Sequence, residues 1–271
     1  MNELTLVTGG TGKTGRRVAR RLADRGLGVR IGSRNGTPPF DWTDPTTWPA
    51  AVRGATSVYL TYQPDLAMPG AAEAVGRLAD LAVEAGARRL VLLSGRGEEE
   101  TWPAEQAVRE AGANWTILRA SWFAQNFSEF FLLDGVRGGI VALPAPDAPE
   151  PFVDVEDIAD VAVAALTDDR HVGRTYEVTG PRALTFTEAT AEIGAAIGRE
   201  IRYVPVTVDE YARAAEAVLP AEEARAIATL FAKVLDGRNS RPADGVREVT
   251  GRDATDFRDF VKAAAAEGAW S

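Results

Sequence analysis

Residues 4–15 read Leu-Thr-Leu-Val-Thr-Gly-Gly-Thr-Gly-Lys-Thr-Gly, and this stretch decides the fold. An apolar run leads into Gly9, Gly12 and Gly15, spaced G-x-x-G-x-x-G, and an amphipathic segment then predicts a helix over 16–25. The first glycine can make the tight turn out of a strand, the second lets backbone approach a pyrophosphate, and the third lets the helix pack closely on the sheet. Because the N–H groups at the start of that helix face the anion, the stretch predicts a dinucleotide-binding unit.

Two other interpretations of this stretch exist. Gly12-Lys13-Thr14 is similar to the end of a triphosphate-binding loop, but G-x-x-x-x-G-K-[ST] requires glycine at position 7, where the chain has Val7. That alternative is therefore excluded. The other is a glycine-rich turn without a ligand, and the strand before the glycines and the helix after them favour the dinucleotide site over it.

Composition bounds the class of protein. The 271 residues, 45% of them hydrophobic, suffice for one large α/β domain or for a domain with an appended lobe. Acidic residues outnumber basic ones by 39 to 30, and no long basic cluster occurs, which argues against nucleic acid and anionic membranes as partners. The absence of cysteine and the single histidine exclude disulfides and thiolate nucleophiles and argue against a metal site. With no signal-peptide pattern and no membrane-spanning run, we expect a cytoplasmic protein.

Strand and helix patterns alternate along the first half of the chain. The predicted strands cover 4–8, 29–32, 57–62, 89–94 and 115–119, with a short extended piece near Phe40, and the predicted helices cover 16–25, 48–53, 70–85 and 103–111. This alternation predicts a doubly wound parallel sheet. The apolar runs 58–60 and 90–93 show no alternation, as expected for strands that are covered on both faces.

The second half is less regular. Glycines and prolines over 135–151 predict a loop excursion, and 236–251 is also predicted as a loop, between helices over 221–235 and 257–267. Acidic residues at helix starts are interpreted as structural caps. These are Asp154-x-x-Asp157 before a helix over 158–166, Thr185-x-x-Glu188 and Thr207-x-x-Glu210.

The end of the second predicted strand bears on the choice of cofactor. A site for NAD usually has an acid there, which binds the ribose 2′-hydroxyl, whereas a 2′-phosphate favours arginine. The chain has Gly32-Ser33-Arg34. Arg34 can bind a phosphate through two hydrogen bonds and Ser33 can donate a third, so NADPH is preferred. If Arg34 is only a solvated loop cation, NADH binds as well.

Several motifs in order along the chain resemble one family. They are Val7-Thr8-Gly9-Gly10-Thr11-Gly12, Trp115–Arg119 followed by Trp122-Phe123-x-x-Asn126-Phe127, Phe152-Val153-Asp154-x-x-Asp157-Ile158-Ala159, and Gly173-x-x-Tyr176–Pro181. Over nearly its whole length the chain resembles the NmrA-like branch of the atypical short-chain dehydrogenases/reductases, which includes NADPH-dependent quinone reductases and redox-sensing regulators. The resemblance implies an α/β Rossmann-type doubly wound parallel sheet with a small C-terminal substrate-binding lobe.

The resemblance also places residues around the cofactor. Asp41 and Trp42 would border the adenine, the segment 61–64 would lie along the dinucleotide, and Ser94 and Gly95 would pass near the nicotinamide. The predicted cofactor-binding residues are Gly9, Thr11, Gly12, Lys13, Thr14, Gly15, Ser33, Arg34, Asp41, Trp42, Thr61, Tyr62, Gln63, Ser94 and Gly95. We expect one NAD(P)-binding domain over 1–271, with its core at about 1–134, sheet completion at about 152–180, and the substrate lobe formed by about 135–151 and 181–271.

The Tyr-x-x-x-Lys pair of the main short-chain branch is missing. None of the five tyrosines (59, 62, 176, 203 and 211) has lysine four residues on, and no lysine occurs between Lys13 and Lys233. Reduction of an unactivated ketone without a placed acid would lose about 10²- to 10⁴-fold in rate. Simple alcohol dehydrogenation is therefore disfavoured.

A quinone needs less help, because hydride addition yields an aromatic anion whose charge is delocalised. An orienting pocket with a few donors then suffices, and we expect it outside the carboxyl ends of the strands. Its predicted members are Tyr62 and Asn126, which would orient the substrate, and Trp122, Phe123, Gln125 and Phe127 as the pocket wall. The alternative is that these aromatic residues are the buried side of a helix. Arg119 either contacts a ligand or forms a structural salt bridge.

These observations predict an NADPH-dependent reductase of a quinone or another planar conjugated acceptor, such as a polycyclic aromatic, with no flavin and no metal. A more specific hypothesis is that the reduced aromatic then reacts with oxygen, which would make the protein part of a flavin-independent monooxygenation. The alternative from another class is a regulatory protein that senses NADP(H) without turnover. Azo, imine and enone acceptors and the oligomeric state stay open.

Overall fold

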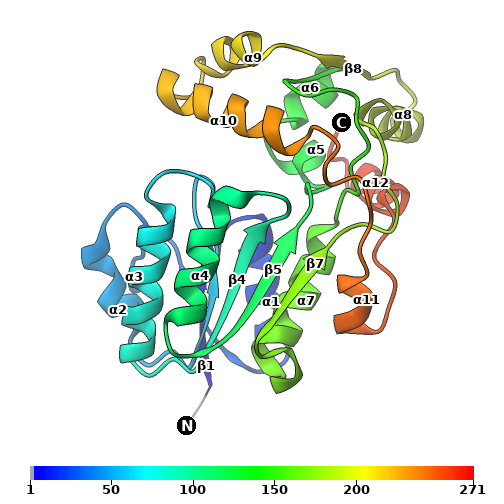
Figure 1. Cartoon of the computed structure of the whole chain (residues 1–271). Coiled ribbons are helices and arrows are strands. Elements are labelled where there is room, and N and C mark those ends of the chain that lie inside the picture. Colours follow the sequence, from blue (N-terminus) through cyan, green and yellow to red (C-terminus); the bar gives the residue numbers. More distant parts are fainter. Residues whose placement is uncertain (1–2) are drawn as a thin grey trace. The chain divides into compact units, whose positions relative to one another are not determined.

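Six parallel strands form the sheet of the computed structural model, which describes residues 3–271 (Figure 1). They are β1 (Leu4–Thr8), β2 (Gly28–Gly32), β3 (Ser57–Leu60), β4 (Arg89–Gly95), β5 (Asn114–Ala120) and β7 (Arg174–Val178). Their order is β2-β1-β3-β4-β5-β7, so the chain moves outward in opposite directions from the boundary between β1 and β3. This is the switch point at which doubly wound sheets bind ligands. The predicted Rossmann-type sheet is confirmed.

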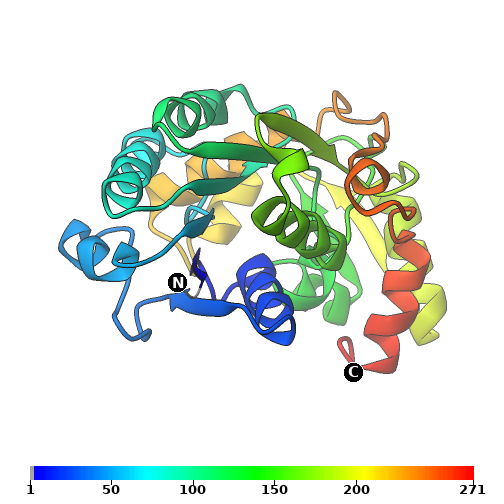
Figure 2. The same cartoon turned by 90° about the horizontal axis from the view of Figure 1, so that it is seen from below.

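Helices cover both faces of this sheet, as the view from below shows (Figure 2). The main ones are α1 (Lys13–Asp24), α2 (Trp48–Val52), α3 (Ala71–Glu84), α4 (Trp102–Glu110) and α7 (Val155–Thr167), with short 3₁₀ turns at Pro45–Thr47, Glu99–Thr101 and Asp169–His171. Helix α1 packs against α7, and α3 packs against α2 and α4. Side chains such as Leu6, Val58 and Leu90 are completely buried between the layers. This double cover explains why the central strands carry unbroken apolar runs.

A second set of elements has its own core, in which Phe127, Phe152, Phe186 and Phe257 touch one another. Strands β6 (Ile140–Leu143) and β8 (Arg202–Pro205) pair in parallel, and the helices are α5 (Asn126–Glu129), α6 (Leu133–Gly138), α8 (Phe186–Ile197), α9 (Val208–Ala215), α10 (Ala221–Val234) and α12 (Phe257–Ala266). The predicted capping boxes are confirmed, because Thr185 and Glu188 cap α8 and Thr207 and Glu210 cap α9 reciprocally.

The chain thus divides into two units. The first comprises Met1–Ala120, Val155–Val178 and Gly245–Arg252, and the second comprises Ser121–Asp154, Thr179–Asp244 and Asp253–Ser271. The boundary falls earlier than the expected position near residue 134, and the segment 245–252 returns to the first unit. Within residues 3–271, no helix is both long enough and apolar enough to span a membrane.

Two predicted loops contain regular structure, so those predictions are wrong. Within 135–151 the chain completes α6 and forms β6, and the glycines there permit close packing: a Cβ atom on Gly135 would lie 2.6 Å from the carbonyl oxygen of Ile140. Within 236–251 lies α11 (Gly245–Thr250), whose Gly245 passes so close to β7 that a Cβ atom would lie 2.2 Å from the carbonyl oxygen of Glu177. In both segments glycine serves tertiary contact rather than disorder.

Smaller differences concern element ends. Helix α1 begins at Lys13, three residues earlier than predicted, so Thr14 and Gly15 belong to its first turn. Strand β3 ends at Leu60, so Thr61 and Tyr62 lie beyond the strand, in the segment that follows it.

Candidate functional site

The loop between β1 and α1 has the geometry that its three glycines predict. Gly9 adopts a positive φ of 59°, and a Cβ atom there would lie 2.4 Å from Oγ1 of Thr61. A Cβ atom on Gly15 would lie 2.2 Å from the carbonyl oxygen of Gly9. Thr61, which follows β3, holds the end of β1 in place, because its hydroxyl donates to the carbonyl of Thr8 and its N–H donates to the Thr8 hydroxyl. Any larger residue at Gly9 or Gly15 would displace this loop.

The first turn of α1 is left without a side-chain cap. Its N-cap residue is Gly12, and no acidic residue lies in the first turn. Side-chain oxygens of Thr185, Thr207 and Asp256 cap α8, α9 and α12. Helices α3 and α10 lack such a cap as α1 does, so the glycine loop, and not the missing cap alone, distinguishes α1. The first N–H groups of a helix have no acceptor within the helix, so an anion is their natural partner. The loop therefore fits the pyrophosphate of a dinucleotide.

Arg34 lies just beyond the end of β2 and is exposed. Within residues 3–271 it forms no ion pair or side-chain hydrogen bond. Asp41 approaches it across the loop: hydrogen bonds from the N–H and hydroxyl of Thr43 lower the pKa of Asp41, and the charge of Arg34 lowers it further. Arg34 is therefore available to an external anion at the place where a 2′-phosphate is expected.

Trp42 and Tyr62 meet beside the glycine loop. Their ring centroids are 5.0 Å apart, and the indole N–H of Trp42 donates to the carbonyl of Thr61 at 2.9 Å. Gln63 reaches the same loop, since its Nε2 lies 4.0 Å from a Cβ atom built on Gly12. The Tyr62 hydroxyl forms no hydrogen bond within the described chain, and burial, followed by the charge of Glu73, raises its pKa. Tyr62 therefore holds its proton firmly, unlike a tyrosine beside lysine.

Ser94 belongs to a buried network of hydrogen bonds that was not predicted. Its hydroxyl donates to Oε1 of Glu105 at 2.9 Å, and Arg119 binds both carboxylate oxygens of Glu105 at 2.8 and 2.7 Å. Arg109 adds a third donor. Glu105 is completely buried, and although burial opposes its charge, these hydrogen bonds lower its pKa. Arg119 thus forms the structural salt bridge that was one of its two interpretations.

The position of Glu105 in the sequence held a signal for this network. Thr101, Glu105 and Val108 recur at helical spacing and are all completely buried. A carboxylate within a buried stripe requires paired cations, and the arginines at 109 and 119 are the partners. Gly95 follows at the end of β4, where a Cβ atom would lie 2.1 Å from the Glu98 side chain. Proximity of Ser94 and Gly95 to the nicotinamide stays a prediction.

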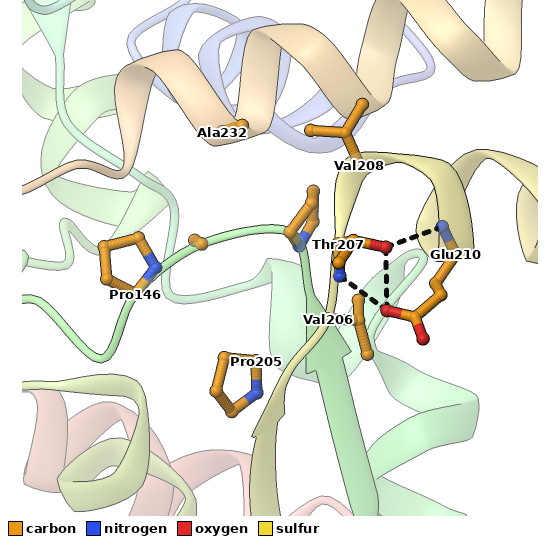
Figure 3. A pocket seen from close by; sticks show the side chains of 9 residues that line it. Pro146, Pro205, Val206, Thr207, Val208, Glu210 and Ala232 are labelled. Atoms are coloured by element: carbon orange, nitrogen blue, oxygen red, sulfur yellow. Dashed lines mark hydrogen bonds between the residues drawn. The ribbon is translucent and has the colours of Figure 1, made fainter.

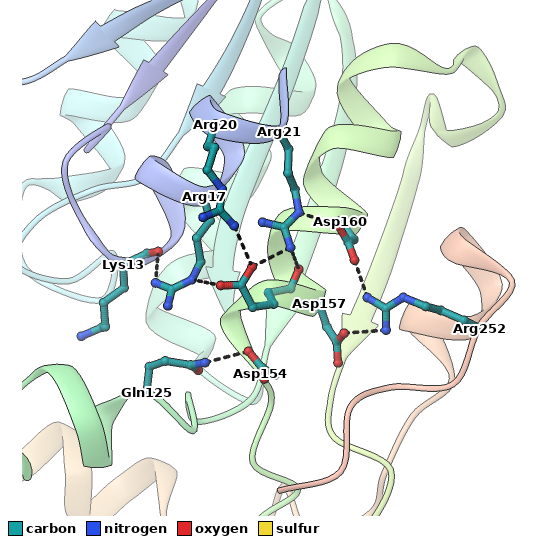
Figure 4. Close-up of polar contacts among 10 residues, drawn as sticks. Lys13, Arg17, Arg20, Arg21, Gln125, Asp154, Asp157, Asp160 and Arg252 are labelled. Atoms are coloured by element: carbon teal, nitrogen blue, oxygen red, sulfur yellow. Dashed lines mark hydrogen bonds and ion pairs between the residues drawn. The ribbon is translucent and has the colours of Figure 1, made fainter. Parts of the chain in front are cut away.

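Ion pairs tie α1 to α7 (Figure 4). Arg17 and Arg21 bind Glu156 at 2.5 and 2.6 Å, and Arg21 also binds Asp160 at 2.6 Å. Burial opposes the charge of Glu156, yet the two arginines lower its pKa. Arg17 also donates to the carbonyl of Lys13 at 2.9 Å, so this network holds the first turn of α1 in place.

Helix α11 joins the same network through Arg252, two residues beyond its end at Thr250. Arg252 binds Asp157 at 2.7 Å and also pairs with Asp160 (Figure 4). Asp157 is completely buried. The structural interpretation of this acid is therefore supported.

The predicted pocket residues of the second unit have different environments. Phe127 is completely buried in the aromatic core, where its ring centroid lies 5.5 Å from that of Phe152. This favours a packing role over substrate contact. Gln125 donates to Oδ1 of Asp154 at 2.7 Å (Figure 4), so its amide already serves the fold. Trp122 and Phe123 precede α5 and stay partly exposed. Asn126 is 8% exposed and forms no side-chain hydrogen bond among residues 3–271.

An open surface pocket of about 500 Å³, which was not predicted, also lies in the second unit (Figure 3). It is lined by Pro144, Ala145, Pro146, Pro205, Val206, Thr207, Val208, Glu210 and Ala232. The size is that of small-molecule sites, and the wall is mostly apolar. Its main polar side chains, Thr207 and Glu210, bond to each other in the cap of α9, which leaves the pocket with little to orient a ligand.

Comparison with known proteins gives consistent results. The model of the NmrA-like family matches residues 39–260. A (4-alkanoyl-5-oxo-2,5-dihydrofuran-3-yl)methyl phosphate reductase of Streptomyces griseus subsp. griseus is 37% identical over 95% of this chain and 96% of its own. The NAD(P)H azoreductase of Xenophilus azovorans is 32% identical, covering 97% and 98%.

Among solved structures, the NADPH complex of an NADPH-dependent quinone oxidoreductase from Escherichia coli matches with a TM-score of 0.75. It is 20% identical, and the match covers 96% of this chain and 99% of that one. At this level of identity, the likeness supports the fold.

Proposed function

The chain belongs to the NmrA-like family, and on this premise we propose that it is an NADPH-dependent reductase that transfers hydride to a quinone or another planar conjugated acceptor. The observation that carries the proposal is the glycine loop with the uncapped N-terminus of α1 behind it. The relatives named above are reductases, and the azoreductase is named for NAD(P)H.

The bound cofactor would supply the hydride, and the chain would supply its position. The loop from Gly9 to Gly15 would hold the pyrophosphate through backbone N–H groups. Arg34 would bind the 2′-phosphate, which supports NADPH over NADH because no residue among 3–271 neutralises this cation in an ion pair. Trp42 would lie at the adenine end, where its ring is already fixed by the hydrogen bond to Thr61.

The acceptor class follows from the proton donors that the chain has. Neither the sequence nor the environment of Tyr62 offers a phenol with a lowered pKa. An acceptor that spreads the incoming negative charge over a conjugated system needs only orientation, and no phenol with a lowered pKa. The azo compounds and unsaturated lactones named for the relatives are likewise conjugated.

A steady-state assay tests the proposal. The purified chain is mixed with NADPH or NADH and a panel of 1,4-naphthoquinone, an azo dye and an unsaturated lactone, and cofactor absorbance is followed. We expect acceptor-dependent oxidation of NADPH, with a lower KM for NADPH than for NADH. Tight NADPH binding without turnover of any acceptor would instead support a sensor of the cofactor.

The monooxygenation hypothesis has its own test. A polycyclic hydroxyanthraquinone is incubated with the protein and NADPH with and without oxygen, and the products are compared by mass. An oxygen-containing product formed only in air supports the hypothesis, and identical products in both conditions contradict it.

A further inference from the structure

The five tyrosines differ in whether their hydroxyl groups are engaged. Tyr176 bonds to Nδ1 of His171 at 2.9 Å, and Tyr203 donates to the carbonyl of Ala145 at 2.8 Å. Tyr59 is completely buried in the first unit. Within the described chain this leaves Tyr62 in the first unit and Tyr211 in the second as partly exposed phenols without a hydrogen-bond partner.

Tyr211 extends a group of aromatic side chains on the second unit. Phe231 of α10 lies 5.7 Å from Tyr211, 5.2 Å from Phe131 and 4.8 Å from Trp122, measured between ring centroids. These four residues, here called the aromatic wall, are all partly exposed rather than buried in the core. The stacked pair of Phe131 and Phe231 shows that the wall already accommodates parallel rings.

The aromatic wall contains a second unused donor. The indole N–H of Trp122 is buried and has no hydrogen-bond partner among residues 3–271. Buried donors are almost always paired, so this one calls for an explanation. Trp122 is held in place from both sides, since its backbone N–H donates to Glu150 and its ring meets Phe186 edge to face. The indole N–H of Trp122 therefore has a fixed position in the protein without a ligand.

We propose that the aromatic wall binds the acceptor and that the Tyr211 hydroxyl donates a hydrogen bond to a carbonyl oxygen of that acceptor. This inference rests on the proposed function and narrows the acceptor class to planar, electron-poor rings that carry carbonyl oxygens. Burial raises the pKa of Tyr211 to about 12, so the phenol remains a donor throughout the neutral range. Both unused groups of the wall are donors, which favours an acceptor with oxygen lone pairs over a cationic dye.

Binding of an anthraquinone sulfonate in the presence of NADP⁺ provides the test, because no hydride can be transferred from the oxidised cofactor. Affinity is measured by quenching of tryptophan fluorescence for the wild type, Tyr211→Phe and Tyr203→Phe. We expect Tyr211→Phe to weaken binding about 3- to 10-fold, the value of one lost hydrogen bond. Tyr203→Phe is the matched control, because it also deletes a phenol oxygen from the second unit but one that already bonds to the chain.

Turnover separates this role from a structural one. With 1,4-naphthoquinone, Tyr211→Phe should raise the KM for the quinone by a similar factor and leave the Kd for NADPH and the thermal midpoint unchanged. Anthraquinone affinity equal to that of the wild type, or an equal loss in Tyr203→Phe, would overturn the role of Tyr211. If the wild type oxidises NADPH with quinones while Tyr211→Phe is unaffected, only this inference fails. If the wild type shows no turnover at all, the proposed function fails.

Discussion

Arg34 is the residue on which the choice of cofactor depends. It is exposed, unpaired within residues 3–271 and placed two residues after the end of β2. We predict that Arg34→Gln raises the KM for NADPH about 10- to 100-fold, because hydrogen bonds to a charged group are lost, and changes the KM for NADH by less than twofold. Steady-state kinetics with both cofactors and one quinone measure this.

The control for Arg34 is Arg25→Gln, which also removes one positive charge. Arg25 lies at the C-terminal end of α1, whereas the glycine loop lies at the N-terminal end of that helix. This control variant should leave both KM values unchanged. An equal loss for NADPH and NADH in Arg34→Gln would mean that Arg34 supports the loop rather than the 2′-phosphate.

Residue types were easier to predict from the sequence than residue partners. The close backbone approach at the glycines and the place of Arg34 near a strand end could be predicted because both are local to a turn and a strand end, whereas their contacts with a cofactor stay predictions. The environment of Gln125 could not, because its partner Asp154 lies 29 residues further along the chain. For Ser94 the buried stripe that contains Glu105 was a signal, but it does not say which hydroxyl group the carboxylate binds. Hydrogen-bond partners of this kind are set by tertiary packing, which one sequence does not reveal.

The loop between β1 and α1 requires glycine because its backbone atoms lie too close together for a side chain. We predict that Gly15→Ala lowers the free energy of unfolding by about 1–3 kcal/mol, as overpacking does, and weakens NADPH binding more than tenfold. The reason is that the new methyl group would lie 2.2 Å from the carbonyl oxygen of Gly9, which cannot move without shifting the loop. Urea unfolding and a fluorescence titration with NADPH measure the two effects.

Gly138→Ala is the matched control, since this helical glycine in α6 has no atom within 4 Å of the new methyl group. It should be neutral or slightly stabilising, given the better helix propensity of alanine. If Gly15→Ala binds NADPH as the wild type does, the loop does not hold the cofactor.

Elements with strong local signals were predicted well, and elements held by tertiary contact were not. The capping boxes of α8 and α9 are encoded within four residues, so the sequence reveals them. Helix α11 has glycine at its start and β-branched residues within it, a poor combination for an isolated helix. It is stabilised by its packing against β7 and by the ion pairs of Arg252.

At the scale of the whole molecule, the chain crosses between its two units several times, which explains the limits of the domain prediction. Strand β7 and helix α7 complete the first unit after an excursion through β6, and α11 returns again later. Alternating strand and helix patterns predict the sheet, but they do not say which later segment rejoins it. The candidate cofactor residues all belong to the first unit, and the aromatic wall belongs to the second.

Stability against acid is a property of the whole molecule to which one group contributes separately. His171, the only histidine of the sequence, is buried. Its Nδ1 bonds to Tyr176, and its Nε2 has no partner in the part of the chain that the structure describes. Burial lowers its pKa, with Asp168 opposing and nearby arginines assisting. Near pH 6.5 the unfolded chain therefore binds a proton that the folded chain does not bind. The contribution of His171 to the free energy of unfolding is fully present above that pH and is lost as the pH falls through it.

The carboxylates respond at lower pH. Glu156 and Asp160 have lowered pKa values in the fold, so the stability they add is present above about pH 4.5 and is lost below it. We predict that the free energy of unfolding of the wild type, measured in urea, falls between pH 7.5 and 5.5, and that His171→Gln removes this decline but keeps the one below pH 4.5. Tyr176→Phe, which keeps the buried imidazole, should retain both declines. A decline between pH 7.5 and 5.5 that persists in His171→Gln would assign it to groups other than the histidine.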